Sequence, residues 1–163
     1  ALTVRLAGLE RAAPLRVVLD GRLRLPLTHG LVRDAEQVAT LVMTGRHAPA
    51  DRLNAFQDAG VEIVQLATDE AGALSVAAAL EALAARGVTR VLVEGGGQLA
   101  AGLLRQGLVD RLIWFRSPRV IGGDGIPAVA GFGLDDLGVA PGFVRRGATP
   151  VGDDVMETYV RSP

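Results

Sequence analysis

Short apolar runs recur along the chain, separated by segments of helical spacing or by glycine-rich turns. Most runs are rich in Val, Ile and Leu without polar alternation, which is typical of strands buried on both faces of a sheet. The last run alternates instead, as a strand with one solvent-facing side does. Strands are therefore expected at residues 15–20, 38–44, 61–66, 90–94, 111–117 and 154–160.

Two segments between these runs have the pattern of helices. Leu53 and Phe56 stand at helical spacing, and Gly60 follows where that helix would end. Ser75 is a favourable N-cap for the Ala-rich segment that Gly87 closes, because a serine hydroxyl accepts a hydrogen bond from a first-turn N–H. Strands alternating with helices predict an α/β fold with a mostly parallel central sheet flanked by helices.

The end of the chain departs from this alternation. Residues 122–142 are rich in Gly and Pro and are expected to be mostly loop. The last strands lack an obvious crossover helix and are therefore expected to pair antiparallel. A length of 163 residues suits one domain with a real core, so residues 1–163 are expected to form a single domain.

Composition limits the chemistry of the chain. A net charge of −1 gives no basic excess for nucleic acid or an anionic membrane. No apolar stretch approaches the roughly 18 residues that span a bilayer, and no charged-then-apolar leader opens the sequence, so a cytoplasmic location is the default. Cys and Lys are absent, which excludes thiolate sites, a P-loop lysine and a Schiff-base lysine. A metal site is not expected, because His29 and His47 lie on different segments.

The best candidate for a ligand site lies where the fourth predicted strand ends. Residues 90–94 end in Glu94, three glycines follow, and a helix is expected over residues 98–106. Glycines let the backbone approach a ligand, and a helix N-terminus offers unsatisfied N–H groups with partial positive charge, so the junction suits a phosphate or pyrophosphate. A tight turn is the plain alternative. Glu94 could cap the glycine loop or accept hydrogen bonds from a ligand's hydroxyl or amine groups.

Two further features lie in the next predicted strand and just after it. Trp114 and Phe115 stand within an apolar run and are expected in the core. Arg116 and Arg119 could hold an additional phosphate, while solvated surface arginines are the commoner explanation.

The order of these motifs resembles one known family. VLVEGGGQLAAGLLRQGLVDRLIWFRSPRVIGGDG, residues 91–125, is similar to the reductase half of the bifunctional riboflavin-biosynthesis deaminase/reductase. PLRVVLDGRLRLPL, residues 14–27, and LTVR, residues 2–5, resemble earlier segments of that family. The similarity runs over nearly the whole chain in the right order, so it is more specific than a glycine-rich turn alone.

The resemblance implies a dihydrofolate-reductase-like fold, NADPH as cofactor and a homodimer. The implied reaction reduces 5-amino-6-(5-phosphoribosylamino)uracil, opening its ribose ring to a ribityl chain. Position by position, Leu2, Arg5 and Glu94 would contact the substrate, with Arg5 paired to its phosphate. Relatives often have Ser at position 21. The implied cofactor residues are Gly21, Gly96, Gly97, Gln98, Leu99, Ala100, Ala101 and Gly102.

The departures from the family matter as well. Its reductase half opens with a strand–helix–strand that carries a Lys, a Ser and an Asp, and its deaminase half carries zinc motifs; none of these is found in this sequence. The chain therefore resembles the C-terminal portion of a longer protein and is expected to be inactive alone. Two alternatives remain: a reductase that acts on the 2,5-diamino pyrimidinone before deamination, and a non-catalytic dimerisation module. A generic dinucleotide-binding domain is disfavoured, because its fingerprint normally follows the first strand.

Overall fold

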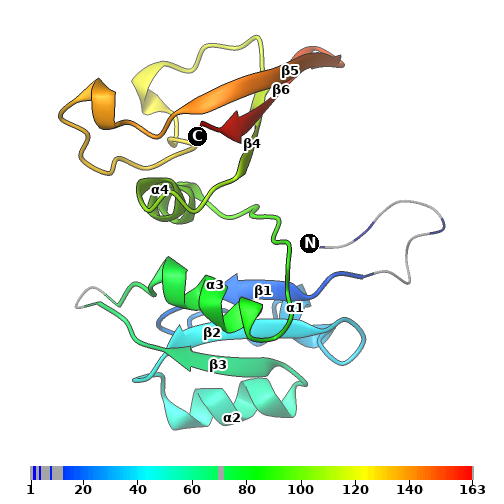
Figure 1. Cartoon of the computed structure of the whole chain (residues 1–163). Coiled ribbons are helices and arrows are strands. Elements are labelled where there is room, and N and C mark those ends of the chain that lie inside the picture. The colour runs from blue at the N-terminus through cyan, green and yellow to red at the C-terminus, as the bar shows by residue number, and fades with distance from the viewer. Residues whose placement is uncertain (1, 3, 5–7, 9–12, 70–71, 163) are drawn as a thin grey trace. The chain divides into compact units, whose positions relative to one another are not determined.

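The computed structural model describes residues 2, 4, 8, 13–69 and 72–162 (Figure 1). The chain divides into two compact units, Ala1–Val88 and Thr89–Pro163, and each has a sheet of its own. The first unit contains β1 (Arg16–Leu19), α1 (Gly30–Arg33), β2 (Thr40–Gly45), α2 (Ala50–Asp58), β3 (Glu62–Leu66) and α3 (Val76–Ala84). The second contains α4 (Gly97–Arg105), β4 (Arg111–Arg116), short 3-10 helices at Gly122–Asp124 and Leu137–Val139, β5 (Phe143–Val151) and β6 (Asp154–Arg161).

The sheet of the first unit is parallel throughout, in the order β1–β2–β3. Every residue of β2 is buried, because helices cover both faces of this central strand (Figure 1). Val42 packs with Phe56 of α2 on one face, whereas Leu41 and Met43 pack with Leu83 of α3 on the other. Successive side chains of a strand point to opposite faces, so an unbroken apolar run can fill both layers. The predicted doubly buried strand is confirmed here.

The helix boundaries of this unit follow from local sequence. The Ser75 hydroxyl accepts a hydrogen bond from the Ala78 N–H at 3.3 Å and caps α3, as predicted. Gly60 and Gly87 follow α2 and α3 with φ of +79° and +78°, a backbone conformation that favours glycine. The predicted helix ends are therefore confirmed.

A buried arginine fastens α1 to this sheet. Arg16 is 2% exposed, and among the described residues no carboxylate pairs with it. Its guanidinium donates to the Thr40 hydroxyl from Nε at 3.0 Å and from Nη2 at 2.6 Å. Nη2 also donates to the carbonyl oxygens of Leu31, Asp34 and Val38 at 3.4, 3.2 and 2.8 Å. These carbonyls lie in α1 and in the segment that leads to β2, so one side chain holds both to the start of β1.

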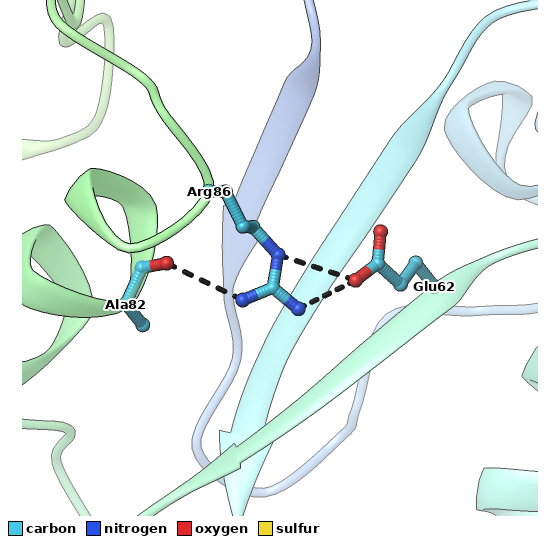
Figure 2. Close-up of polar contacts among 3 residues, drawn as sticks. All are labelled: Glu62, Ala82 and Arg86. Atoms are coloured by element: carbon cyan, nitrogen blue, oxygen red, sulfur yellow. Dashed lines mark hydrogen bonds and ion pairs between the residues drawn. The ribbon is translucent and has the colours of Figure 1, made fainter.

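A second arginine joins the end of α3 to β3 at the surface (Figure 2). Arg86 donates from Nε and Nη2 to one oxygen of Glu62 at 3.2 and 2.5 Å, and from Nη1 to the Ala82 carbonyl at 3.3 Å. The carbonyl belongs to the last turn of α3, where a cation is favourable. Both side chains remain partly exposed, so the pair contributes little to stability.

The sheet of the second unit is antiparallel, in the order β4–β6–β5. The predicted antiparallel pairing of the last strands is confirmed. Sequence reasoning missed β5, which lies just after the Gly- and Pro-rich segment and contains Pro150 itself. The β5–β6 ladder is irregular between Arg145 and Gly147. Such a bulge blurs the alternation by which a strand is recognised.

Glu157 of β6 is the buried charge of this second sheet, at 5% exposure. Its carboxylate accepts a hydrogen bond from Arg116 Nε at 2.9 Å and lies 3.5 Å from Arg145 Nη1, so it links β4, β6 and β5. Burial raises the pKa of Glu157, but the hydrogen bond and charge of Arg116, together with hydrogen bonds from Tyr159 and Arg145, outweigh it. The pKa therefore lies below its ordinary value.

Two sequence predictions in this unit are wrong. Residues 90–94 do not form a buried strand: they have no secondary structure, and Leu92 is 77% exposed. No described strand pairs with them, and a strand buried on both faces needs neighbours on both sides. Phe115 is likewise not core, because β4 is an edge strand and leaves this ring 59% exposed.

Replacing Arg16 with Met is expected to lower the free energy of unfolding by about 3–5 kcal/mol, because buried carbonyl groups lose their donor. The matched control, Arg86→Met, removes an exposed arginine and is expected to cost less than about 1 kcal/mol. Urea denaturation followed by circular dichroism measures both. Equal losses of unfolding free energy in the two variants would contradict this structural role of Arg16.

Glu157 predicts a defined dependence of stability on pH. Because its folded-state pKa is lowered, the carboxylate stabilises the fold above the unfolded-state pKa of about 4.3, and this stability is lost as the pH falls through the folded-state value. Glu157→Gln is therefore expected to be less stable than the wild type at pH 7 and to lose less stability on acidification. Thermal unfolding between pH 7 and 3 tests this. If the stability difference between the wild type and Glu157→Gln stays constant with pH, the charge of the carboxylate is not its cause.

Candidate functional site

The first turn of α4 has the features of an anion-binding site. The helix begins at Gly97, and its N-cap, Gly96, has no side chain to accept a first-turn N–H. The N–H groups of Gly97 and Gln98 have no acceptor within the helix, because the first N–H groups of a helix precede its ladder of hydrogen bonds. No acidic residue lies in this turn. The backbone therefore presents N–H groups and partial positive charge without a counter-charge from the helix itself.

The three glycines before α4 have different surroundings. A Cβ at Gly95 would lie 2.6 Å from Cδ2 of Leu99, and one at Gly97 would lie 2.7 Å from the carbonyl oxygen of Pro127. A Cβ at Gly96 would meet nothing within 4 Å. Gly96 also has φ −72°, which any residue adopts. Gly95 and Gly97 thus permit close packing, whereas Gly96 leaves open space beside the free N–H groups.

A loop from the Gly- and Pro-rich segment packs against this turn. The Ala130 N–H donates to the Gly97 carbonyl at 3.0 Å, and a Cβ at Gly97 would lie 2.7 and 3.3 Å from the Pro127 and Ala128 carbonyl oxygens. This contact ties residues 127–130 to the start of α4. Sequence reasoning missed these loop residues, since their only signal was a composition rich in Gly and Pro.

Glu94 directly precedes the glycines, but its environment differs from the prediction. It was expected at the end of a buried strand, where its charge would need a partner; instead it is exposed. Among the described residues, it neither hydrogen-bonds nor forms an ion pair, so its carboxylate is not used to cap the glycine loop. Both of its oxygens are available to a ligand.

The remaining predicted cofactor residues fall into two places. Gln98 is exposed in the first turn of α4. Leu99, Ala100 and Gly102 are partly buried along the same helix, whereas Ala101 is buried in it. Of this run, only the beginning of α4 offers free N–H groups to a phosphate.

Gly21 lies in the first unit, whereas α4 lies in the second. It follows β1, and its carbonyl accepts a hydrogen bond from the Gly45 N–H at 2.9 Å. A Cβ at Gly21 would lie only 2.2 Å from the Gly72 carbonyl oxygen. Serine at this position, as relatives often have, would require that backbone to move. Glycine is therefore explained here by a close backbone approach.

The predicted substrate residues near the N-terminus carry little structural information. Leu2 is partly exposed in the first unit, and Arg5 lies outside the described residues.

His29 has a local role, because its Nδ1 accepts the Leu31 N–H at 3.2 Å and caps α1. Within the described ranges, no three His, Asp or Glu side chains gather as metal ligands would, and no helix has the length and apolarity to cross a membrane.

Solved structures assign the architecture. RibD of Acinetobacter baumannii, form 2, aligns with a TM-score of 0.79 at 21% identity, covering 98% of this chain and 42% of that one. The deaminase/reductase of Thermotoga maritima aligns with a TM-score of 0.72 at 26% identity, covering 99% and 41%. These similarities define an α/β protein with the fold of a RibD reductase domain, consistent with the dihydrofolate-reductase-like class predicted from the sequence.

The RibD C-terminal domain family matches residues 1–154, and the chain belongs to this family. Two curated proteins are similar. The 2,5-diamino-6-ribosylamino-4(3H)-pyrimidinone 5′-phosphate reductase of Archaeoglobus fulgidus is 37% identical over 116 residues, 71% of this chain and 50% of that protein. The riboflavin biosynthesis protein RibD of Chlamydia trachomatis is 34% identical over 114 residues, 70% and 29%. The chain therefore spans about half or less of these relatives.

Proposed function

We propose that this chain is part of an NADPH-dependent reductase of 5-amino-6-(5-phosphoribosylamino)uracil in riboflavin biosynthesis. The observation that carries the proposal is the uncapped N-terminus of α4, which follows a free carboxylate and an open glycine in a member of the RibD C-terminal domain family. The reductases among the relatives are named for closely related phosphorylated pyrimidines.

The start of α4 fits a phosphate of the cofactor. Gly96 leaves room for an oxygen to approach, and the N–H groups of Gly97 and Gln98 are directed as donors to an anion. Residues through Gly102 continue the helix whose dipole supports this charge. Gly21 is the second proposed contact of the cofactor. When bound, the nicotinamide supplies hydride, and the protein supplies placement and electrostatics.

Glu94 is the proposed contact for the substrate. Its exposed carboxylate can accept hydrogen bonds from the hydroxyl or amine groups of a phosphoribosylamino compound. Leu2 and Arg5 are proposed substrate contacts from the family resemblance, with Arg5 pairing to the phosphate as guanidinium groups do.

Two further parts of the proposal concern the whole protein. Residues 1–163 would belong to a single reductase-like domain, with the Lys, Ser and Asp of the family's site supplied by a strand–helix–strand outside this sequence. The protein would act as a cytoplasmic homodimer. The alternative substrate is the 2,5-diamino pyrimidinone, after which the Archaeoglobus fulgidus relative is named.

Gly96→Asp and Gly96→Asn place side chains of similar size at the start of α4, and only Asp adds a negative charge. Both side chains can cap α4, so neither is expected to reduce stability. In the complete gene product, the Asp carboxylate would repel a phosphate, and the Kd for NADPH is expected to rise about tenfold, against less than about threefold for Asn. Fluorescence titration measures both; equal effects would mean that no anion sits at Gly96.

Glu94→Gln tests the substrate side. In the complete gene product, NADPH oxidation with the phosphoribosylaminouracil is expected to fall about 10- to 100-fold in kcat/KM, because a charge-assisted hydrogen bond is lost, while the Kd for NADPH stays unchanged. Parallel assays with the 2,5-diamino pyrimidinone identify the preferred substrate. If the wild type consumes no NADPH with either pyrimidine, both reductase proposals fail.

A further inference from the structure

The loop after β1, residues 20–25, is fixed by more contacts than a simple connection needs. The Asp20 carbonyl accepts the Leu23 N–H at 2.9 Å, and the Asp20 carboxylate accepts the Leu25 N–H at 2.6 Å. Arg52 of α2 donates to the Leu23 carbonyl from Nε at 2.7 Å and to the Leu25 carbonyl from Nη2 at 2.8 Å. Two side chains from different parts of the first unit therefore hold the backbone at Leu23 and Leu25.

Leu23 has a conformation that leucine seldom adopts. Its φ is +51°, and among the described residues no other non-glycine residue has a positive φ. Its side chain is nevertheless wholly buried, in the core cluster that contains Val42 and Phe56. A left-handed conformation costs free energy for any residue with a Cβ, and such strain persists where surrounding contacts impose it, often at ligand sites. The strain at Leu23 thus indicates that the shape of this loop serves binding.

Arg24 lies between the two residues that are held, and its side chain is exposed. Among the residues that the structure describes, its guanidinium forms no hydrogen bond or ion pair. Arg22, on the other side of Leu23, packs against a different segment, because a Cβ at Gly72 would lie 2.8 Å from its Nε. The fold therefore fixes the backbone on both sides of Arg24 and leaves its charge available.

The loop also lies where a ligand is expected. It follows β1, and in open parallel sheets ligands bind beyond the carboxyl ends of the strands. It contains Gly21, a proposed cofactor contact, whose carbonyl accepts the Gly45 N–H at the end of the neighbouring strand β2 at 2.9 Å. The carboxylate within the loop, that of Asp20, is already engaged by a backbone N–H. An available guanidinium at this edge suits a phosphate, which it can bind through two parallel hydrogen bonds.

We propose that Arg24 binds the 2′-phosphate of NADPH and selects NADPH over NADH, with Arg52 as the positioning residue that holds it in place. The inference rests on the proposed function for the identity of the cofactor. The two dinucleotides share their pyrophosphate and differ only in the 2′-phosphate. A helix N-terminus that holds the pyrophosphate does not distinguish them, whereas an arginine on the 2′-phosphate does.

Arg24→Gln tests the contact directly. In the complete gene product, the Kd for NADPH is expected to rise about 30-fold, because a charge-assisted contact is lost, while the Kd for NADH changes less than about threefold. The matched control is Arg33→Gln, which removes another exposed arginine of the first unit. Arg33 precedes Asp34, whose carbonyl is bound by Arg16 at the start of β1, so it lies away from the loop. The control is expected to leave both Kd values unchanged in fluorescence titration.

Arg52→Gln tests the positioning role. Arg24 remains, but the carbonyls beside it lose their donor, so the Kd for NADPH is expected to rise about tenfold and that for NADH less than about threefold. A purely structural role of Arg52 would lower the free energy of unfolding without changing the preference between the two dinucleotides. An unchanged preference would therefore refute the positioning role.

The remaining outcomes separate this proposal from the proposed function. If Arg24→Gln changes both Kd values equally or changes neither, Arg24 does not recognise the 2′-phosphate and the proposal is overturned. A wild type that binds NADPH but reduces neither pyrimidine contradicts the proposed reaction, while the comparison of Kd values still decides the role of Arg24. A wild type that binds neither dinucleotide overturns both.

Discussion

Backbone pairing at strand edges is the constraint on which most of this structure depends. β2 is apolar, paired on both sides by β1 and β3, and wholly buried. Residues 90–94 are just as apolar, yet they remain exposed and without secondary structure, because no described strand lies beside them. In this chain, hydrophobicity alone does not bury a strand. Neighbours that satisfy its N–H and C=O groups are needed too.

The run of three glycines has a physical explanation that a turn alone would not give. A Cβ at Gly97 would meet the Pro127 backbone carbonyl, and one at Gly95 would meet the end of the Leu99 side chain, so both glycines favour close packing. Gly96 has room, so it is the position at which a ligand could approach the free N–H groups of α4. Two glycines serve packing and one leaves the helix terminus accessible, which is why a tight turn and an anion-binding site are compatible in the same residues.

Sequence reasoning predicted what local rules decide. The cap at Ser75, the helix end at Gly60 and the doubly buried β2 all depend on residues within or near their own element. The errors have a common cause in pairing between distant segments: residues 90–94 lack neighbours, and Phe115 lies on an open edge. The helix that begins at the last of the three glycines could be predicted because its signals are contiguous in the sequence. The packing of residues 127–130 against the start of this helix could not be predicted. That contact joins segments about thirty residues apart with no side-chain pattern between them.

The conformation of residues 90–94 bears directly on how Glu94 could meet a ligand. These residues have no described strand beside them, so Glu94 extends from a segment whose backbone is not held by a sheet. A carboxylate that must meet a substrate needs a backbone held in one direction, and strand pairing would supply that rigidity. The start of α4 differs in this respect, because its first N–H groups are held in place by the helix itself and need no neighbouring strand.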